Sequence, residues 1–159
     1  MSLLESLRND LLRAMNLLGA MQKQKLYDKS YSFIGTDASP RDEAPDDYAC
    51  AESLCKVIQA AFPELNFPTI LSTRGLFLYF IQSPSFNKVT TPSKGSIIIN
   101  ITGSGNGVVK NGHCGVVGKA WIMSNDSRTG TWEANFTFEG WERFYKTRGG
   151  METHYFDVV

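Results

Sequence analysis

The sequence predicts an α+β domain in which helices come first and an antiparallel sheet follows. Leucines recur at helical spacing near the N-terminus, and a second helical pattern follows Pro45. From Lys94 onward, β-branched segments alternate with glycine-rich turns. This segregation is typical of helices packed on one side of a curled sheet. With 159 residues, 42% of them hydrophobic, the chain suits one compact domain over residues 1–159.

The first segment, residues 1–28, is predicted to be dominated by an amphipathic helix over residues 2–25. Ser2 followed by Glu5 is a capping-box pattern at its start. We expect the apolar stripe to pack on the domain's own core, and docking onto a partner chain is the alternative. The stripe comprises Leu4, Leu7, Leu11, Met15 and Leu18, widened by Leu3 and Leu12.

The remaining segment, residues 29–159, carries the other predicted elements. A turn-rich loop covers residues 35–47, and Asp47 is expected to cap the helix that follows. Ser72 is expected to cap a short helix through Gln82, although its aromatic run is also compatible with a strand. Later elements are strands at Ser96–Ile101, His113–Val117, Ala120–Ser124, Thr131–Phe136 and Thr153–Val158, and a helix at Phe138–Lys146.

Composition and charge exclude several functional classes. Sixteen basic and sixteen acidic residues leave no net charge, so nothing favours nucleic acid as a partner. Charges interrupt the leucines of the first 21 residues, so neither a signal peptide nor a membrane span is expected there. Three cysteines match neither a disulfide framework nor a zinc motif. We therefore expect free thiols, no metal and no organic cofactor.

Cys50 is the candidate nucleophile because it falls in the first turn of a predicted helix. Ala51, Leu54 and Val57 continue the helical pattern behind it. The positive end of the helix dipole favours a thiolate over a thiol at this position. The alternative is that Cys50 is a small buried hydrophobe, as many free cysteines are.

His113 is the candidate base, and Asn125 the group that orients its ring. His113 begins a strand between glycines, and the chain has one other histidine, His154. Asn125 follows twelve positions later, across a turn expected at Gly118-Lys119, so we expect the two side chains to share one face of the hairpin. A cysteine nucleophile needs such a base and such an orienting group. The alternative is that residues 125–127 are simply a turn and His113 a loop residue.

Two neighbours of the nucleophile complete the predicted site. Tyr48 and Glu52 flank Cys50 and are expected to contact an oxyanion or the substrate. Cys55 and Cys114 are expected to pack in the core, because Cys55 lies about half a turn from Cys50 and Cys114 faces away from His113 on its strand.

These residues resemble the papain-like cell-wall cysteine peptidases of the NlpC type and their CHAP relatives. The family places a cysteine at a helix start, then a strand, then a Gly-His-hydrophobic-Gly strand and a polar third residue. The matches are Cys50, Gly95–Ile99, Gly112–Gly118 and Asn125, with Tyr31–Gly35 as a lead-in. Residues 121–130 and 141–145 are similar to phage-type lysins of the group. The resemblance covers residues 30–158, and it departs at Ala49, Ala51, Glu52 and Ser96.

The resemblance implies a peptidoglycan-cleaving cysteine endopeptidase or amidase, associated with a phage and using a Cys50/His113/Asn125 triad. Peptidoglycan is then the partner, and other phage particle proteins are further partners through the N-terminal helix. The expected location is a phage particle or the host cytoplasm before release, with action at the cell wall. Alternatives are a non-catalytic virion or wall-binding protein on the same fold, and a thioester-forming acyltransferase or deamidase.

Overall fold

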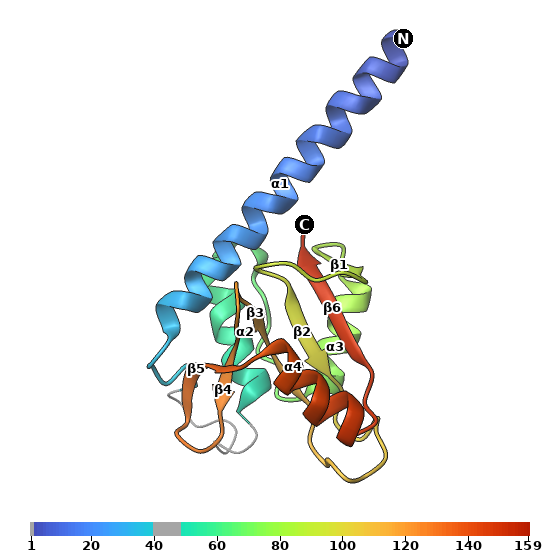
Figure 1. Ribbon diagram of the computed structural model, residues 1–159. Helices are drawn as coiled ribbons and strands as arrows, with labels where there is room; N and C mark the ends of the chain where they lie inside the picture. Colours follow the sequence, from blue (N-terminus) through green and yellow to red (C-terminus); the bar gives the residue numbers. More distant parts are fainter. Residues whose placement is uncertain (1, 40–48) are drawn as a thin grey trace.

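The computed structural model describes residues 2–39 and 49–159, and these form an α+β fold. Six strands make one open antiparallel sheet in the order β1-β6-β2-β3-β4-β5 (Figure 1). The helices are α1 (Leu3–Phe33), α2 (Cys50–Ala61), α3 (Thr73–Gln82) and α4 (Phe138–Trp141), which continues as a π-helix (Glu142–Arg148). The strands are β1 (Phe86–Val89), β2 (Ile97–Asn100), β3 (His113–Val117), β4 (Ile122–Asp126), β5 (Thr131–Phe136) and β6 (Thr153–Val158).

Three predicted strands, β3, β5 and β6, have the bounds expected from the sequence. The β3–β4 hairpin differs, because its loop spans residues 118–121 and is not the two-residue turn expected at Gly118-Lys119. Strand β4 consequently begins two residues later than predicted. The edge strand β1 was not predicted, because its four residues, Phe-Asn-Lys-Val, are too few and too polar to show a period of two.

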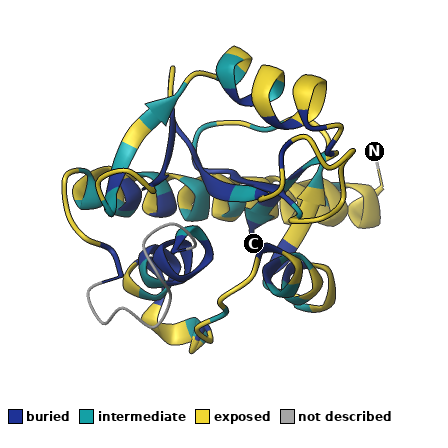
Figure 2. Cartoon of the chain, turned by 90° about the horizontal axis from the view of Figure 1, so that it is seen from below, coloured by how far each residue is buried: buried dark blue, intermediate teal, exposed yellow. Residues whose placement is uncertain are grey.

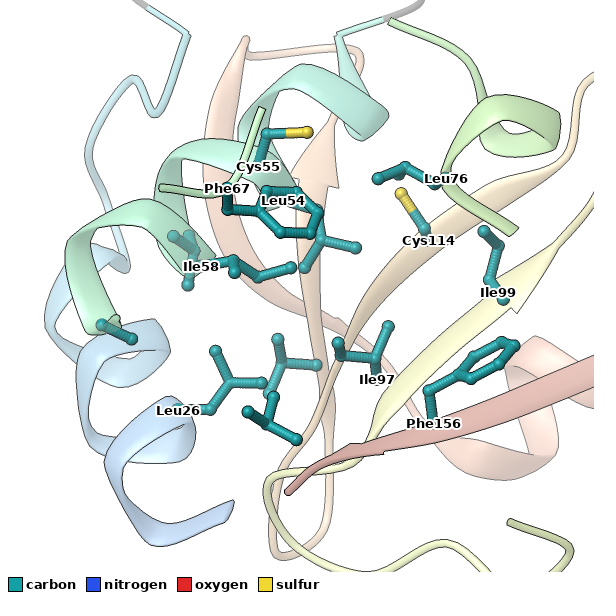
Figure 3. Packing of buried hydrophobic residues seen from close by; sticks show 14 of the residues in the cluster. Leu26, Leu54, Cys55, Ile58, Phe67, Leu76, Ile97, Ile99, Cys114 and Phe156 are labelled. Atoms are coloured by element: carbon teal, nitrogen blue, oxygen red, sulfur yellow. The ribbon is translucent and has the colours of Figure 1, made fainter. Parts of the chain in front are cut away.

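Helices cover both faces of the sheet, so the expectation that they pack on one side is wrong for α4. The larger core lies between the sheet and the α1–α3 side, where Leu26, Leu54 and Ile58 meet Ile97 and the other inward side chains (Figure 3). The smaller core lies on the opposite face and contains Ile98, Val117, Ile122, Trp141, Tyr145 and Met151. Alternation along each strand produces the two cores, because successive side chains point to opposite faces.

Helix α1 does not pack on the core along its predicted length, which corrects the expectation for residues 2–25. Leu26 is its first buried residue, and the capped N-terminal part projects beyond the sheet (Figure 1). The helix also runs on to Phe33, because no proline breaks it, Gly19 is tolerated in its interior, and the next glycine is Gly35. Among the described helices, none is long and apolar enough to cross a membrane.

Helices α2 and α3 begin differently. Ser72 caps α3 as predicted, and its side chain accepts a hydrogen bond from the Gly75 N–H. Helix α2 begins at Cys50 with Ala49 as the N-cap residue, and no side chain in the described part of the chain caps it. The proposed cap Asp47 lies outside the described residues. The first-turn N–H groups of α2 have no partner within the helix, and they lie beside Cys50.

Candidate active site

A cleft of about 910 Å³ opens where the N-terminus of α2 meets the start of β3. Cys50 and Ala51 line it from α2, and His113 lines it from β3. Its remaining walls come from the loops before α3 and β3, the β4–β5 hairpin and the π-helix. Cys50 and His113, separated by 63 positions in sequence, are thus brought to one surface, as predicted.

The pKa of the Cys50 thiol is set by its neighbours. Hydrogen bonding with the Cys114 and His113 side chains and with the Ala51 backbone, and the charge of His113, all lower it. The Cys114 hydrogen bond is the largest influence, and together with His113 it lowers the pKa of Cys50 well below that of a free thiol, against the effect of burial. Cys50 is therefore a thiolate at lower pH than an ordinary cysteine.

The His113 ring is fixed by a chain of two hydrogen bonds. Its Nε2 lies 2.9 Å from Ser124 Oγ, and the Ser124 hydroxyl donates to Asn135 Oδ1 at 2.7 Å. Because a hydroxyl has one proton, Ser124 must accept from His113 Nε2–H. This places the ring proton on Nε2 and leaves Nδ1 as the nitrogen that can take the thiol proton of Cys50.

Aromatic side chains enclose the same ring. Trp141 stacks on His113 with ring centroids 5.3 Å apart, and Tyr145 stacks on it at 5.8 Å. Trp141 is in turn anchored, because its Nε1–H donates to Asn100 Oδ1 at 2.6 Å. Both aromatic residues come from α4 and its π-helical continuation, so this element holds the imidazole plane.

Asn125 does not occupy the predicted orienting position. Gly115 pairs with Ser124 and Val116 with Met123, so His113 shares its face with Ser124, while Asn125 belongs to the opposite face. There Asn125 Oδ1 accepts a hydrogen bond from Ser53 Oγ of α2 at 3.4 Å. The prediction failed because it assigned the wrong residues to a shared face. The loop has an even number of residues, so odd-numbered residues of β3 pair with even-numbered residues of β4. Asn125 still lines the cleft.

Ser124 and Asn135 were missed by sequence reasoning. Ser124 could have been predicted by pairing odd-numbered residues of β3 with even-numbered residues of β4. Asn135 sits at a β-bulge, between the pairs Met123–Ala134 and Ile122–Phe136. The extra residue of a bulge is re-aimed relative to a regular strand, and no sequence signal marked this bulge.

Of the two other predicted site residues, Tyr48 and Glu52, the structure describes one. Tyr48 lies outside the described residues. Glu52 is completely buried, and its carboxylate accepts a hydrogen bond from the Ser39 hydroxyl. Glu52 is absent from the described walls of the cleft, so the predicted substrate contact is corrected to a structural position that ties α2 to Ser39.

The remaining cysteines and histidine lie where they cannot replace Cys50 and His113. Cys55 is buried and bonded to the Ile70 backbone, and burial raises its pKa to about 12. Burial also raises the pKa of Cys114, whose side chain points into the larger core (Figure 3). His154, in β6, packs on Phe77 of α3 with ring centroids 4.6 Å apart, and it does not line the cleft.

Positive charge exceeds negative charge among the described residues that line the cleft. Lys110, Arg128 and Arg148 are among them, and the one carboxylate in this set is Asp126. Arg128 donates to both Asp126 oxygens, at 3.1 and 2.8 Å, and this contact lowers the pKa of Asp126. Lys110 and Arg148 are therefore the two cations in the described walls of the cleft that are not paired with Asp126. In residues 2–39 and 49–159, no three histidine, cysteine, aspartate or glutamate side chains form a candidate metal site.

No protein-family model, curated protein or solved structure matches this chain.

Proposed function

We propose that the chain is a papain-like cysteine hydrolase of the NlpC/CHAP type that cleaves an amide bond in the peptide part of peptidoglycan. One observation carries the proposal: the Cys50 thiol, at the N-terminus of α2, shares a cleft with His113, which helps to lower the pKa of Cys50 and whose tautomer is set by Ser124. A low-pKa thiol, a base and an orienting group are the three parts of a cysteine nucleophile.

The geometry supports acyl transfer in two stages. His113 Nδ1 takes the Cys50 proton, and the sulfur attacks the amide carbonyl. The imidazolium then protonates the leaving nitrogen, so the C–N bond breaks and a Cys50 thioester remains. In the second stage His113 removes a proton from water, the water oxygen attacks the thioester, and the carboxylic acid leaves as Cys50 is restored.

The N-terminus of α2 supplies a donor for the negative oxygen formed in each stage. The first intrahelical bond of α2 runs from the Ser53 N–H to the Ala49 carbonyl, so the Cys50 N–H lies ahead of the helical ladder. A backbone N–H aimed at the developing charge stabilises the transition state more than the ground state. The Ala51 N–H is already bonded to the sulfur, so it stabilises the thiolate.

The charge of the described part of the cleft supports an acidic peptide as substrate. Its described walls carry Lys110 and Arg148, and their one carboxylate, Asp126, is paired with Arg128. The stem peptides of peptidoglycan carry free carboxylates, which two cations would attract. The assignment to a phage lysin rests on the resemblance of residues 121–130 and 141–145 to that group.

Digestion of purified peptidoglycan tests the proposal. Wild-type protein should release new primary amines and soluble fragments, whereas Cys50→Ala and His113→Ala should release none above background. Cys55→Ala and His154→Ala are the matched controls, because they remove the same side chains outside the cleft, and each folded control should keep activity. A folded wild-type protein that releases no amine from several wall types would reject the hydrolase.

The alternatives give distinct results in the same assay. A non-catalytic virion or wall-binding protein would co-sediment with the wall and release nothing. An acyltransferase would form a Cys50 thioester and pass the acyl group to an added amine in preference to water. The assembled Cys50–His113 pair favours an enzyme over the non-catalytic protein, because wall binding alone does not require a low-pKa thiol.

A further inference from the structure

The N-terminal part of α1 presents a continuous apolar surface that nothing in the described chain covers. Leu3 to Met21 precede Leu26, the first buried residue of the helix, and Figure 2 shows this end of the molecule as exposed. Nine large apolar side chains there are between 47% and 78% exposed: Leu3, Leu4, Leu7, Leu11, Leu12, Met15, Leu17, Leu18 and Met21. Apolar patches of this extent mark interaction sites.

The spacing of these side chains matches a coiled-coil seam. Positions 4, 11 and 18 are leucines, and positions 7, 14 and 21 are leucine, alanine and methionine, so intervals of three and four alternate over nearly three heptads. Leu3 and Leu17 lie beside this seam on one edge and Met15 on the other, at g and e positions. A helix with such a seam packs against a helix of the same kind.

The charges on the projecting part argue against a lipid surface. Residues 2–22 contain two acidic side chains, Glu5 and Asp10, and two basic ones, Arg8 and Arg13. Helices that lie on anionic membranes carry an excess of lysine and arginine on the polar face. Equal numbers of both signs are instead typical of a helix that is solvated on one side and packed on another.

The size of the surface fits association with a second copy. Residues 3–21 span roughly 28 Å of helix at about 1.5 Å per residue. Nine exposed apolar side chains offer on the order of 800 Å² per partner, which is the area of a standard stable interface. The projection of α1 away from the sheet leaves this length accessible to another α1 (Figure 1).

We propose that the chain self-associates through residues 3–21 of α1, which pack against the same segment of a second copy. No described side chain of the projecting segment is buried, whereas most helical stability in proteins comes from packing of an apolar face. Burial of the seam between copies supplies the missing contact. The result is a multivalent particle with a cleft on each copy, which raises the effective affinity for a polymeric substrate.

Light scattering coupled to size-exclusion chromatography tests this on the full chain. The wild type should elute with at least twice the 17.7 kDa mass of one chain. Leu4→Glu, Leu11→Glu and Leu18→Glu together should give a monomer, with the thermal unfolding of the body unchanged. The matched control is Asn9→Glu, Asn16→Glu and Ala20→Glu, which adds the same three charges off the seam and should keep the oligomer.

Each other outcome overturns the proposal. A wild type that stays monomeric at about 100 µM rejects self-association, because an interface of this standard size should form at lower protein concentrations. If that monomer floats with vesicles of phosphatidylethanolamine and phosphatidylglycerol, the surface binds lipid instead. An oligomer that persists in the seam variant places the interface elsewhere. None of these readouts uses peptidoglycan, so their outcome is independent of whether the chain is a hydrolase.

Discussion

Ser124 Oγ lies 2.9 Å from His113 Nε2, on the same face of the β3–β4 hairpin. Ser124, backed by Asn135, therefore holds the position that the sequence led us to assign to Asn125. A serine hydroxyl, unlike a carboxylate, can either donate to the ring or accept from it, and here it accepts from Nε2–H because its own proton is donated to Asn135. The orientation of the base thus depends on two residues acting in series.

Ser124→Ala should slow alkylation of Cys50 by iodoacetamide near neutral pH by roughly tenfold to a hundredfold, the range typical of residues that orient a functional histidine. The reason is that Nε2–H loses its acceptor, so the tautomer with the proton on Nε2 and a free Nδ1 for the Cys50 proton is no longer enforced. Asn135→Ala should act in the same direction. Asn125→Ala is the comparison, and a larger loss there than at Ser124 would restore the original assignment.

Cys50 should be labelled far faster than Cys55 or Cys114 in the native protein. Its pKa is lowered, so its thiolate persists as pH falls below about 8.5, the value for a free thiol. Labelling is lost only as pH falls through the lowered pKa. Cys55, with a pKa raised to about 12 by burial, stays protonated over the same range. Peptide mass spectrometry after brief labelling between pH 5 and 9 measures this, and equal labelling at three sites would rule it out.

The hydrogen bond from Cys114 should contribute to the low pKa of Cys50. Cys114→Ala removes the donor, so the pH midpoint of Cys50 labelling should move upward. Cys114→Ser keeps a donor in a side chain of similar size and should move the midpoint less. Identical midpoints in wild type, alanine and serine variants would show that His113 and the helix N-terminus act without Cys114.

Gly112→Ala should destabilise the protein by about 1–3 kcal/mol, the range for overpacking a close contact. A Cβ at this position would lie 2.0 Å from the Asn100 carbonyl oxygen, so β2 and the start of β3 would have to separate beside His113. Gly19→Ala is the control, because nothing lies within 4 Å of a Cβ there. Urea unfolding measures both, and equal stabilities would contradict the close approach.

Removal of residues 1–21 should leave the body folded. Every large apolar side chain described in that stretch is exposed, so its loss removes no buried contact. Leu26→Ala should instead cost about 2–5 kcal/mol, because that side chain is fully buried. Thermal unfolding by circular dichroism distinguishes the two, and collapse of the truncated protein would mean that the projecting helix supports the core.

The sequence predicted those parts of the fold whose signals are local. Ser72 identified the start of α3, and glycines with alternating side chains identified β3 and β6. Helical periodicity showed that α1 has an apolar face, but periodicity does not say what covers that face. The expectation that this face packs on the domain's own core was therefore wrong, and the apolar side chains from Leu3 to Met21 are exposed.

The candidate site was predictable as far as Cys50 and His113, since a helix start and a glycine-flanked strand start are both visible in sequence. The third residue, Ser124, depended on the length of the loop between β3 and β4, which decides which residues of the two strands share a face. The fourth, Asn135, depended on a bulge in β5. The contact between Cys50 and Cys114 joins a helix to a strand, and no local pattern encodes such a contact.

The covalent state of Cys50 during turnover tests the central claim most directly. Wild-type protein mixed with soluble peptidoglycan fragments and quenched in acid within milliseconds to seconds should carry an acyl group on the peptide containing Cys50, as measured by mass spectrometry. The adduct should disappear on longer incubation as a free acid forms, and His113→Ala should not form it, while His154→Ala should. Wild-type protein that releases amines without any acyl group on Cys50, or that carries the group on another residue, would contradict the account.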